Sequence, residues 1–319
     1  MPARYHRIHD ILYNSQFRLT MPTKEASTEW LGFAGVGADA QDISAGVWPH
    51  ASFINHSCLG NVSRAFVGDL MVVRAVRPIR AGEELLFSFC TYKNPDRKGV
   101  LRRGWGFECR CPWCTAEAHD DQNAIDLRNK LWDAADTFVV LKLRDLFRGR
   151  TVSRNVVSQI DDKLRELHAT YDRDLYQGIP RIVSLEIYQA PFEVILLTSP
   201  LAQATSSLHF YLMATHAVRK DYEEAVKAAR EYMLSLGYDD VGFDRDNVVL
   251  RSSKHVLLLP DAVQALQIAA AAKVMLREEG TAKEIDKYAI VIYETINGVT
   301  SGYKSVEEKM RARPGTCII

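Results

Sequence analysis

The chain has 319 residues, of which 47% are hydrophobic and 25% are charged, the composition of an ordinary globular protein. Its 40 basic and 40 acidic residues cancel, so it lacks the concentrated positive charge with which proteins bind nucleic acids. No stretch approaches the roughly 20 apolar residues of a membrane-spanning helix, and residues 1–13 show no apolar core of a secretion signal. We therefore expect neither nucleic acid nor a membrane as a partner.

The first third of the chain predicts one short helix and several short strands. Residues 1–16 favour a helix because Ile8, Ile11 and Leu12 are spaced for one face. Residues 18–46 contain four glycines among aspartates and serines, which is typical of an irregular connection with short strands. Further strands are predicted over residues 62–66, 70–76 and 85–89, the first two joined by Gly68-Asp69 and the last largely buried.

The pattern changes to helical periodicity after Cys114. An acidic linker over residues 118–122 precedes predicted helices at residues 125–146, 156–171, 185–198, 202–219, 222–236, 262–279 and 282–297. Their short polar links suggest antiparallel hairpins, similar to tetratricopeptide repeats but without a strict period of 34 residues. We therefore predict an α+β fold, with small strands in residues 1–117 and an all-α region in residues 118–319.

Four of the six cysteines fall in two places. Cys58 ends the run Asn55-His56-Ser57-Cys58, and a Cys-x-Cys-x-x-Cys segment follows about fifty residues later. A tetrahedral zinc ion needs four ligands, and a short loop seldom supplies all of them. We predict a structural zinc on Cys58, Cys109, Cys111 and Cys114, in preference to four ordinary buried thiols. Such cysteines without a secretion signal indicate a reducing compartment, so we expect a cytoplasmic or nuclear location.

These motifs carry a family resemblance. Asn55-His56-Ser57-Cys58, Gly82-Glu83-Glu84 and Phe107-Glu108-Cys109-x-Cys111-x-x-Cys114 resemble the second half of a SET domain with its zinc-bearing post-SET segment. The spacing is most similar to the SET-and-MYND branch and to fungal SET proteins with a helical repeat tail. In that branch the cysteine of the first motif shares one zinc with the three later cysteines. The resemblance implies a partial SET core with a post-SET zinc segment over residues 1–117, and a helical tetratricopeptide-like domain over residues 118–319.

The resemblance also implies an activity, namely methyl transfer from S-adenosylmethionine to a lysine of a protein substrate. The positions that would bind this cofactor are Ser52, Asn55, His56 and Phe107. The positions that would line the substrate pocket are Asn14, Ser15, Phe89, Tyr92 and Trp105. His56 could also be an ordinary hydrogen-bonded structural histidine, but the surrounding tetrapeptide and the later cysteines favour a pocket role.

Two features depart from the family pattern. The family has tyrosines at the positions of Phe89 and Trp105, and neither of these side chains can accept a hydrogen bond from the substrate amine. Tyr92, three residues after Phe89, could substitute. The 54 residues before Asn55 contain no match to the Gly-x-Gly segment that holds the methionine end of the cofactor, and no cysteines of a MYND module. The first departure removes the groups that would orient the substrate amine, and the second makes bound S-adenosylmethionine doubtful.

The sequence therefore leaves three functions open. The first is a divergent SET methyltransferase. The second is a SET fold repurposed as an enzyme for an apolar small molecule, acting by isomerisation or cyclisation in a confined cleft. Its cleft would be lined by Trp48, Phe53, Phe87, Phe89, Trp105 and Phe107, although each could simply belong to the core. The third is a non-catalytic interaction module whose helical tail binds a partner.

Overall fold

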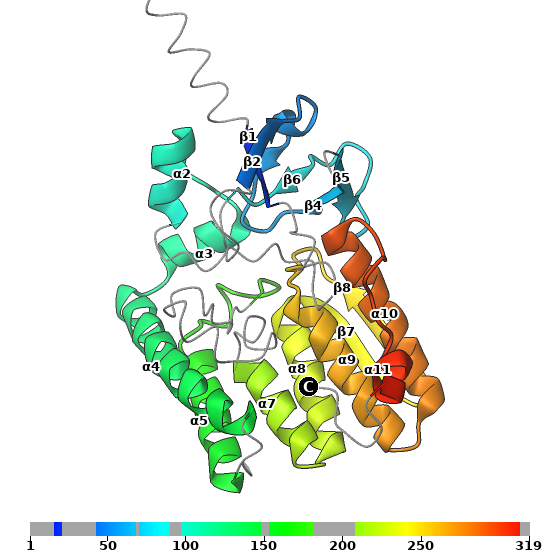
Figure 1. Ribbon diagram of the computed structural model, residues 1–319. Coiled ribbons are helices and arrows are strands. Elements are labelled where there is room, and N and C mark those ends of the chain that lie inside the picture. Colours follow the sequence, from blue (N-terminus) through cyan, green and yellow to red (C-terminus); the bar gives the residue numbers. More distant parts are fainter. Residues whose placement is uncertain are drawn as a thin grey trace, which may run out of the picture.

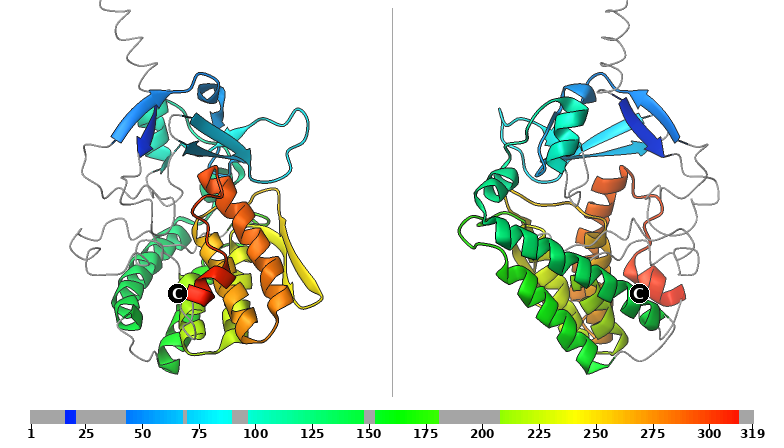
Figure 2. Two further views of the ribbon diagram at one scale, coloured as in Figure 1. Left: turned by 45° about the vertical axis from the view of Figure 1, so that its right-hand side comes forward. Right: turned by 90° about the vertical axis from the view of Figure 1, so that its left-hand side faces the viewer.

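The computed structural model describes residues 16–20, 43–67, 70–89, 97–147, 153–180 and 208–312 (Figure 1). Small sheets lie at one end of the molecule and long helices at the other, as both views in Figure 2 show. This arrangement is the predicted α+β fold. The helices predicted over residues 1–16 and 185–198 fall outside the described residues, except that Gln16 begins a strand instead of ending a helix.

The first part of the chain forms two-stranded sheets. They pair β1 (Gln16–Thr20) with β2 (Ile43–Val47), β3 (Asn55–His56) with β6 (Leu86–Phe87), and β4 (Val62–Val67) with β5 (Leu70–Ala75). The antiparallel β4–β5 hairpin confirms two of the predicted strands. β3 and β6 run parallel, so that Asn55 lies opposite Leu86 and His56 lies opposite Phe87.

The third predicted strand is shorter and more exposed than the sequence suggested. Within residues 85–89 the strand β6 covers only two residues, and Leu85 is 44% exposed. The pairing is short because β3 offers only two residues. The Leu86 N–H is bound by the side-chain oxygen of Asn61, at 2.8 Å, so a side chain takes the place of a strand partner.

The 3-10 turn η1 (Ala51–Phe53) lies between β2 and β3. After β6 the chain enters the helical region through α2 (Arg97–Trp105), α3 (Pro112–His119), the 26-residue α4 (Gln122–Phe147) and α5 (Arg154–Ala169). Proline suits the first turn of α3 because its missing N–H would have no helical partner there. Since α3 extends to His119, the linker predicted over residues 118–122 shrinks to Asp120 and Asp121.

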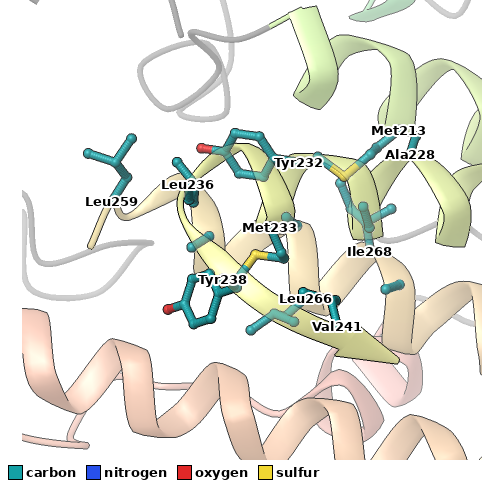
Figure 3. Close-up of a cluster of buried hydrophobic side chains, with 14 of the residues drawn as sticks. Met213, Ala228, Tyr232, Met233, Leu236, Tyr238, Val241, Leu259, Leu266 and Ile268 are labelled. Carbon is teal, nitrogen blue, oxygen red and sulfur yellow. The ribbon is translucent and has the colours of Figure 1, made fainter. Parts of the chain in front are cut away.

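The remaining helices pack side by side around a buried core (Figure 1). They are α7 (Leu208–Val218), α8 (Tyr222–Ser235), α9 (Asp261–Met275), α10 (Glu279–Asn297) and α11 (Val306–Ala312). Helix α9 is buried along almost its whole length, from Asp261 to Lys273, and lies between α8 and α10. Figure 3 shows Met233 of α8 beside Leu266 of α9. None of the described helices combines the length and apolarity that a membrane crossing requires.

The prediction that residues 118–319 are all-α is wrong. Between α8 and α9 lies an antiparallel hairpin of β7 (Tyr238–Asp244) and β8 (Asn247–Ser252). Val241 and Phe243 are buried, and Arg245 and Asp246 form the turn. Alternating apolar residues around a polar turn are a hairpin signal, and the helical periodicity on either side masked it.

The β4–β5 hairpin holds the end of α10. Arg74 of β5 forms an ion pair with Glu294 at 2.9 Å and donates to the Gly298 carbonyl at 3.1 Å. Gly298 ends α10 with a φ of +79°, and a side chain there would lie 3.2 Å from the Ala65 Cβ atom. A cation at the C-terminal end of a helix is electrostatically favourable, so Arg74 links the sheets to the helical region.

A buried arginine near the start of α4 ties that helix to the segment that follows α5. Arg128 pairs with Asp120 at 2.9 Å, and their side chains are 8% and 3% exposed. It also donates to the Thr170 carbonyl at 2.6 Å, and its guanidinium lies 3.8 Å from the centre of the Tyr171 ring. Tyr176 donates a further hydrogen bond to Asp120 at 2.9 Å.

We expect Arg128→Ala to lower the free energy of unfolding by about 3 kcal/mol, because it leaves a buried carboxylate without its cation. Arg165→Ala is the matched control. Arg165 pairs with Asp162 at the same 2.9 Å, but the two side chains are 76% and 51% exposed, so a loss below about 0.5 kcal/mol is expected. Urea unfolding followed by circular dichroism measures both, and equal losses would contradict this assignment.

Candidate metal centre and cofactor site

Four thiols from two distant segments meet beside β3. The four Sγ atoms all lie within 4.8 Å of one another. Cys58 Sγ lies 3.6 Å from Cys114 Sγ and 3.9 Å from Cys109 Sγ. Four sulfurs around a tetrahedral zinc ion, each ~2.3 Å from the metal, would be about 3.8 Å apart. The structure thus brings the four predicted cysteines together at a spacing that could hold a zinc ion.

The local backbone arranges the three later cysteines. Cys111 caps the N-terminus of α3, where its sulfur accepts from the Cys114 N–H at 3.5 Å. The Cys109 sulfur accepts from the Cys111 N–H at the same distance. Two of the described N–H groups therefore point at sulfur atoms, which favours the thiolate form that a metal binds.

The thiols perturb one another strongly. The hydrogen bond with Cys109 raises the pKa of the Cys58 thiol, and the hydrogen bond with Cys111 lowers the pKa of the Cys109 thiol. Cys58 and Cys114 are 1% and 3% exposed. Buried thiols so close together cannot all ionise unless a cation lies among them, and a divalent metal would supply that charge. The donor set therefore fits zinc.

Arg97 places a positive charge beside this cluster. Its guanidinium lies 4.1 Å from the centre of the Trp113 ring, and it pairs with Glu117. Burial alone would lower the pKa of Arg97, but the bond to Glu117 and the nearby thiols outweigh burial and raise it. A permanent cation here would offset the negative charge of a metal with four thiolates.

The predicted cofactor residues Ser52 and Asn55 lie at the surface. Ser52 donates to the Trp48 carbonyl at 3.0 Å. Asn55 donates from its side chain to Glu84 at 2.7 Å, so the two sequence motifs meet. The neighbouring Glu83 is bound by Arg77, and this hydrogen bond lowers the pKa of Glu83 to about 2.

Asn61 is a positioning residue that sequence reasoning missed. It is 2% exposed, and its side chain donates to the Glu84 carbonyl at 2.8 Å as well as accepting from Leu86. The preceding Gly60 lies so close to β6 that an added Cβ would sit 2.6 Å from the Leu86 oxygen. No sequence feature showed that the Asn61 side chain would bind the backbone of β6, because this contact joins residues 25 positions apart.

Aromatic rings gather around His56. The centroid of its imidazole lies 5.2 Å from that of Phe89 and 5.8 Å from that of Phe107. The Phe89 ring also contacts Trp105, at 5.3 Å between centroids. The structure thus brings together two residues predicted to bind the cofactor, His56 and Phe107, and two predicted to line the substrate pocket, Phe89 and Trp105. The other predicted pocket residues, Asn14, Ser15 and Tyr92, lie outside the described part of the chain.

The aromatics predicted to line an apolar cleft do not all gather here. Phe87 packs on Phe89 with centroids 5.4 Å apart. Trp48 packs on Phe66 at 5.1 Å, and Phe53 of η1 is 85% exposed. Phe53 therefore does not line an enclosed space, which corrects that part of the prediction.

Comparison with known proteins agrees with the motifs. Residues 11–90 match the family model of the SET domain. The chain is similar to protein-lysine N-methyltransferase SMYD4 of Homo sapiens, with 36% identity over 81 residues, 24% of this chain and 10% of the relative. It is similar to N-lysine methyltransferase SMYD2 of Homo sapiens, with 32% identity over 130 residues, 40% of this chain and 28% of the relative. For histone-lysine N-methyltransferase SMYD3 of Mus musculus the identity is 37% over 90 residues, 28% of this chain and 21% of the relative.

These matches confirm the resemblance to the SET-and-MYND branch. They span between 10% and 28% of the relatives' own lengths. The SET-domain match covers the part of the chain that carries β1 to β6, and the 130-residue match to SMYD2 is longer than that domain.

We expect the purified protein to retain about one zinc ion per chain, and Cys58→Ser to lose most of it, because the other three thiolates would leave the site incomplete. Inductively coupled plasma mass spectrometry after exhaustive dialysis measures the content. Cys317→Ser, at a cysteine that is not one of the four predicted ligands, is the control and should keep its zinc. A zinc-free wild-type protein, or a Cys58→Ser protein with full zinc, would contradict the assignment.

Proposed function

We propose, from the SET domain at residues 11–90, that this protein binds S-adenosylmethionine and transfers its methyl group to a lysine of a protein substrate. One observation carries the proposal. The thiol cluster holds the segment after α2 against β3, so that Phe107 packs on His56 although the two are 51 residues apart. The relatives named above are lysine methyltransferases, which supports the same activity here.

The proposed division of roles follows the geometry. The cofactor supplies a methyl group activated by a sulfonium. Asn55 and His56 at β3 would hold it, with Ser52 beside them and Phe107 against its adenine ring. The lysine amine must arrive uncharged and in line with the methyl group. Phe87, Phe89 and Trp105 form an apolar wall that excludes water and disfavours the ammonium form.

The absence of a hydroxyl at Phe89 is the divergent feature of this site. A phenylalanine ring offers no hydrogen-bond acceptor to orient an amine. Orientation must then come from the shape of the pocket and from groups outside this ring cluster. We therefore propose a slower or more selective enzyme than one with a tyrosine at this position.

We further propose that zinc at the four cysteines is structural. All four positions are filled by protein ligands, whereas a catalytic zinc keeps one open. Residues 1–117 would form the SET and post-SET unit, and residues 118–319 a tetratricopeptide-like domain interrupted by the β7–β8 hairpin. Cysteines at metal spacing support a reducing location, cytoplasmic or nuclear.

The alternative functions have unequal support. An enzyme for apolar small molecules needs open space among the aromatic residues. The Phe89 ring, however, is flanked by those of Phe87, Trp105 and Phe107 at 5.3 to 6.3 Å between centroids. A binding role for the helical region has one specific observation in its favour, a groove of about 1000 Å³ between α10 and α11.

Isothermal titration calorimetry tests the proposed cofactor. We expect S-adenosylmethionine to bind the zinc-loaded protein, and Asn55→Ala to weaken binding about tenfold, the effect of one lost hydrogen bond of ~1.4 kcal/mol. Asn123→Ala, an exposed asparagine on α4, is the control and should bind as the wild type does. Absence of heat at millimolar cofactor would overturn the proposal.

A second variant tests the effect of the hydroxyl that is missing at Phe89. Phe89→Tyr adds a hydroxyl at the pocket and should raise the rate of methyl transfer to lysine peptides, because the amine then gains an acceptor. Mass spectrometry of the methylated peptide measures this rate. A lower rate in this variant would show that Phe89 is required as it is.

A further inference from the structure

The two nitrogens of the His56 ring face different partners. Nδ1 lies 2.9 Å from the backbone nitrogen of Phe89. A backbone N–H can only donate, so Nδ1 must accept and carries no proton. Nε2 lies 3.4 Å from the Cys58 sulfur. A neutral imidazole has one proton, which the geometry therefore places on Nε2, facing that sulfur.

We propose that His56 is a positioning residue that couples the metal cluster to the wall of the substrate pocket. Its Nε2–H donates to the Cys58 thiolate, while its Nδ1 holds the backbone N–H of Phe89. The assignment of a pocket wall to Phe89 rests on the proposed function. The two hydrogen bonds rest on the geometry alone.

The end of β6 explains why Phe89 needs such a partner. The β3–β6 pairing reaches Phe87, and the Ser57 N–H donates to the Phe87 carbonyl at 3.3 Å. Two residues further on, the Phe89 N–H is bound by the His56 side chain. The imidazole thus continues the hydrogen bonding of the strand past the point where the backbone pairing ends.

The aromatic neighbours limit how the imidazole can turn. The rings of Phe89 and Phe107 lie 5.2 and 5.8 Å from it, at interplanar angles of 60° and 48°. A thiolate bound to a metal has no proton to donate and can only accept, so a loaded cluster selects the same tautomer.

Nitrogen NMR of the zinc-loaded protein with ¹⁵N-labelled histidine tests the tautomer directly. Comparison with the His56→Asn protein assigns the signals among the nine histidines. We expect the His56 ring to carry its proton on Nε2, with Nδ1 unprotonated and accepting from the Phe89 N–H. A protonated Nδ1 would overturn the proposal. This test needs no methyl transfer, so it stands whether or not the proposed activity is found.

Two variants separate the two hydrogen bonds. An asparagine amide reaches the place of Nδ1, so His56→Asn can still hold the Phe89 N–H but loses the donor to Cys58. A glutamine amide reaches the place of Nε2, so His56→Gln keeps that donor but releases Phe89. Mutation of a residue that hydrogen-bonds to a metal ligand typically weakens metal affinity about 10-fold to 100-fold.

We expect His56→Asn to release zinc to a chelator about tenfold faster than the wild type, with the Phe89 amide protected from hydrogen exchange as before. His56→Gln should show the reverse, with zinc retained and the Phe89 amide exchanging about tenfold faster. Equal effects of the two substitutions on both readouts would overturn the proposal. If neither variant folds, through-space contacts between the His56 and Phe89 rings assign the His56 signals in the wild-type protein, and its tautomer decides.

Discussion

The contact of four sulfur atoms constrains the rest of the site. Cys58 and the Cys109–Cys114 segment approach until their sulfurs lie within 4.8 Å of one another, although about fifty residues separate them. Thiols this close and this buried repel one another when ionised, so the arrangement needs a cation. With that cation in place, α3 and the segment before it are fixed against β3. The ring of Phe107 then has a defined position beside His56.

The rest of the site is held by side chains more than by long strands. Pairings of two residues, such as β3 with β6, have little stability of their own. Asn61 and His56 each bind a backbone N–H on or just after β6, at Leu86 and Phe89. On the other side, Arg74 and Gly298 dock the end of α10 onto the β4–β5 hairpin. The helical region thereby supports the sheets that carry the site.

Much of this could be predicted from patterns local in sequence. The cysteine spacing indicated the thiol cluster, and the motifs indicated the family, because both depend on residue types at fixed separations. The β4–β5 hairpin and the helices α5, α8, α9 and α10 followed from periodicity. What escaped prediction depends on contacts between distant residues. Asn61 gained its role only once Gly60 let the chain approach β6, and β6 is short because a side chain replaces its strand partner.

Zinc K-edge X-ray absorption of the purified protein observes the ligands of the proposed zinc ion directly. We expect a first shell of four sulfur atoms at ~2.3 Å, with His56 hydrogen-bonded to the shell and not part of it. A shell with fewer than four sulfurs, or one that includes an imidazole nitrogen at ~2.0 Å, would contradict this expectation.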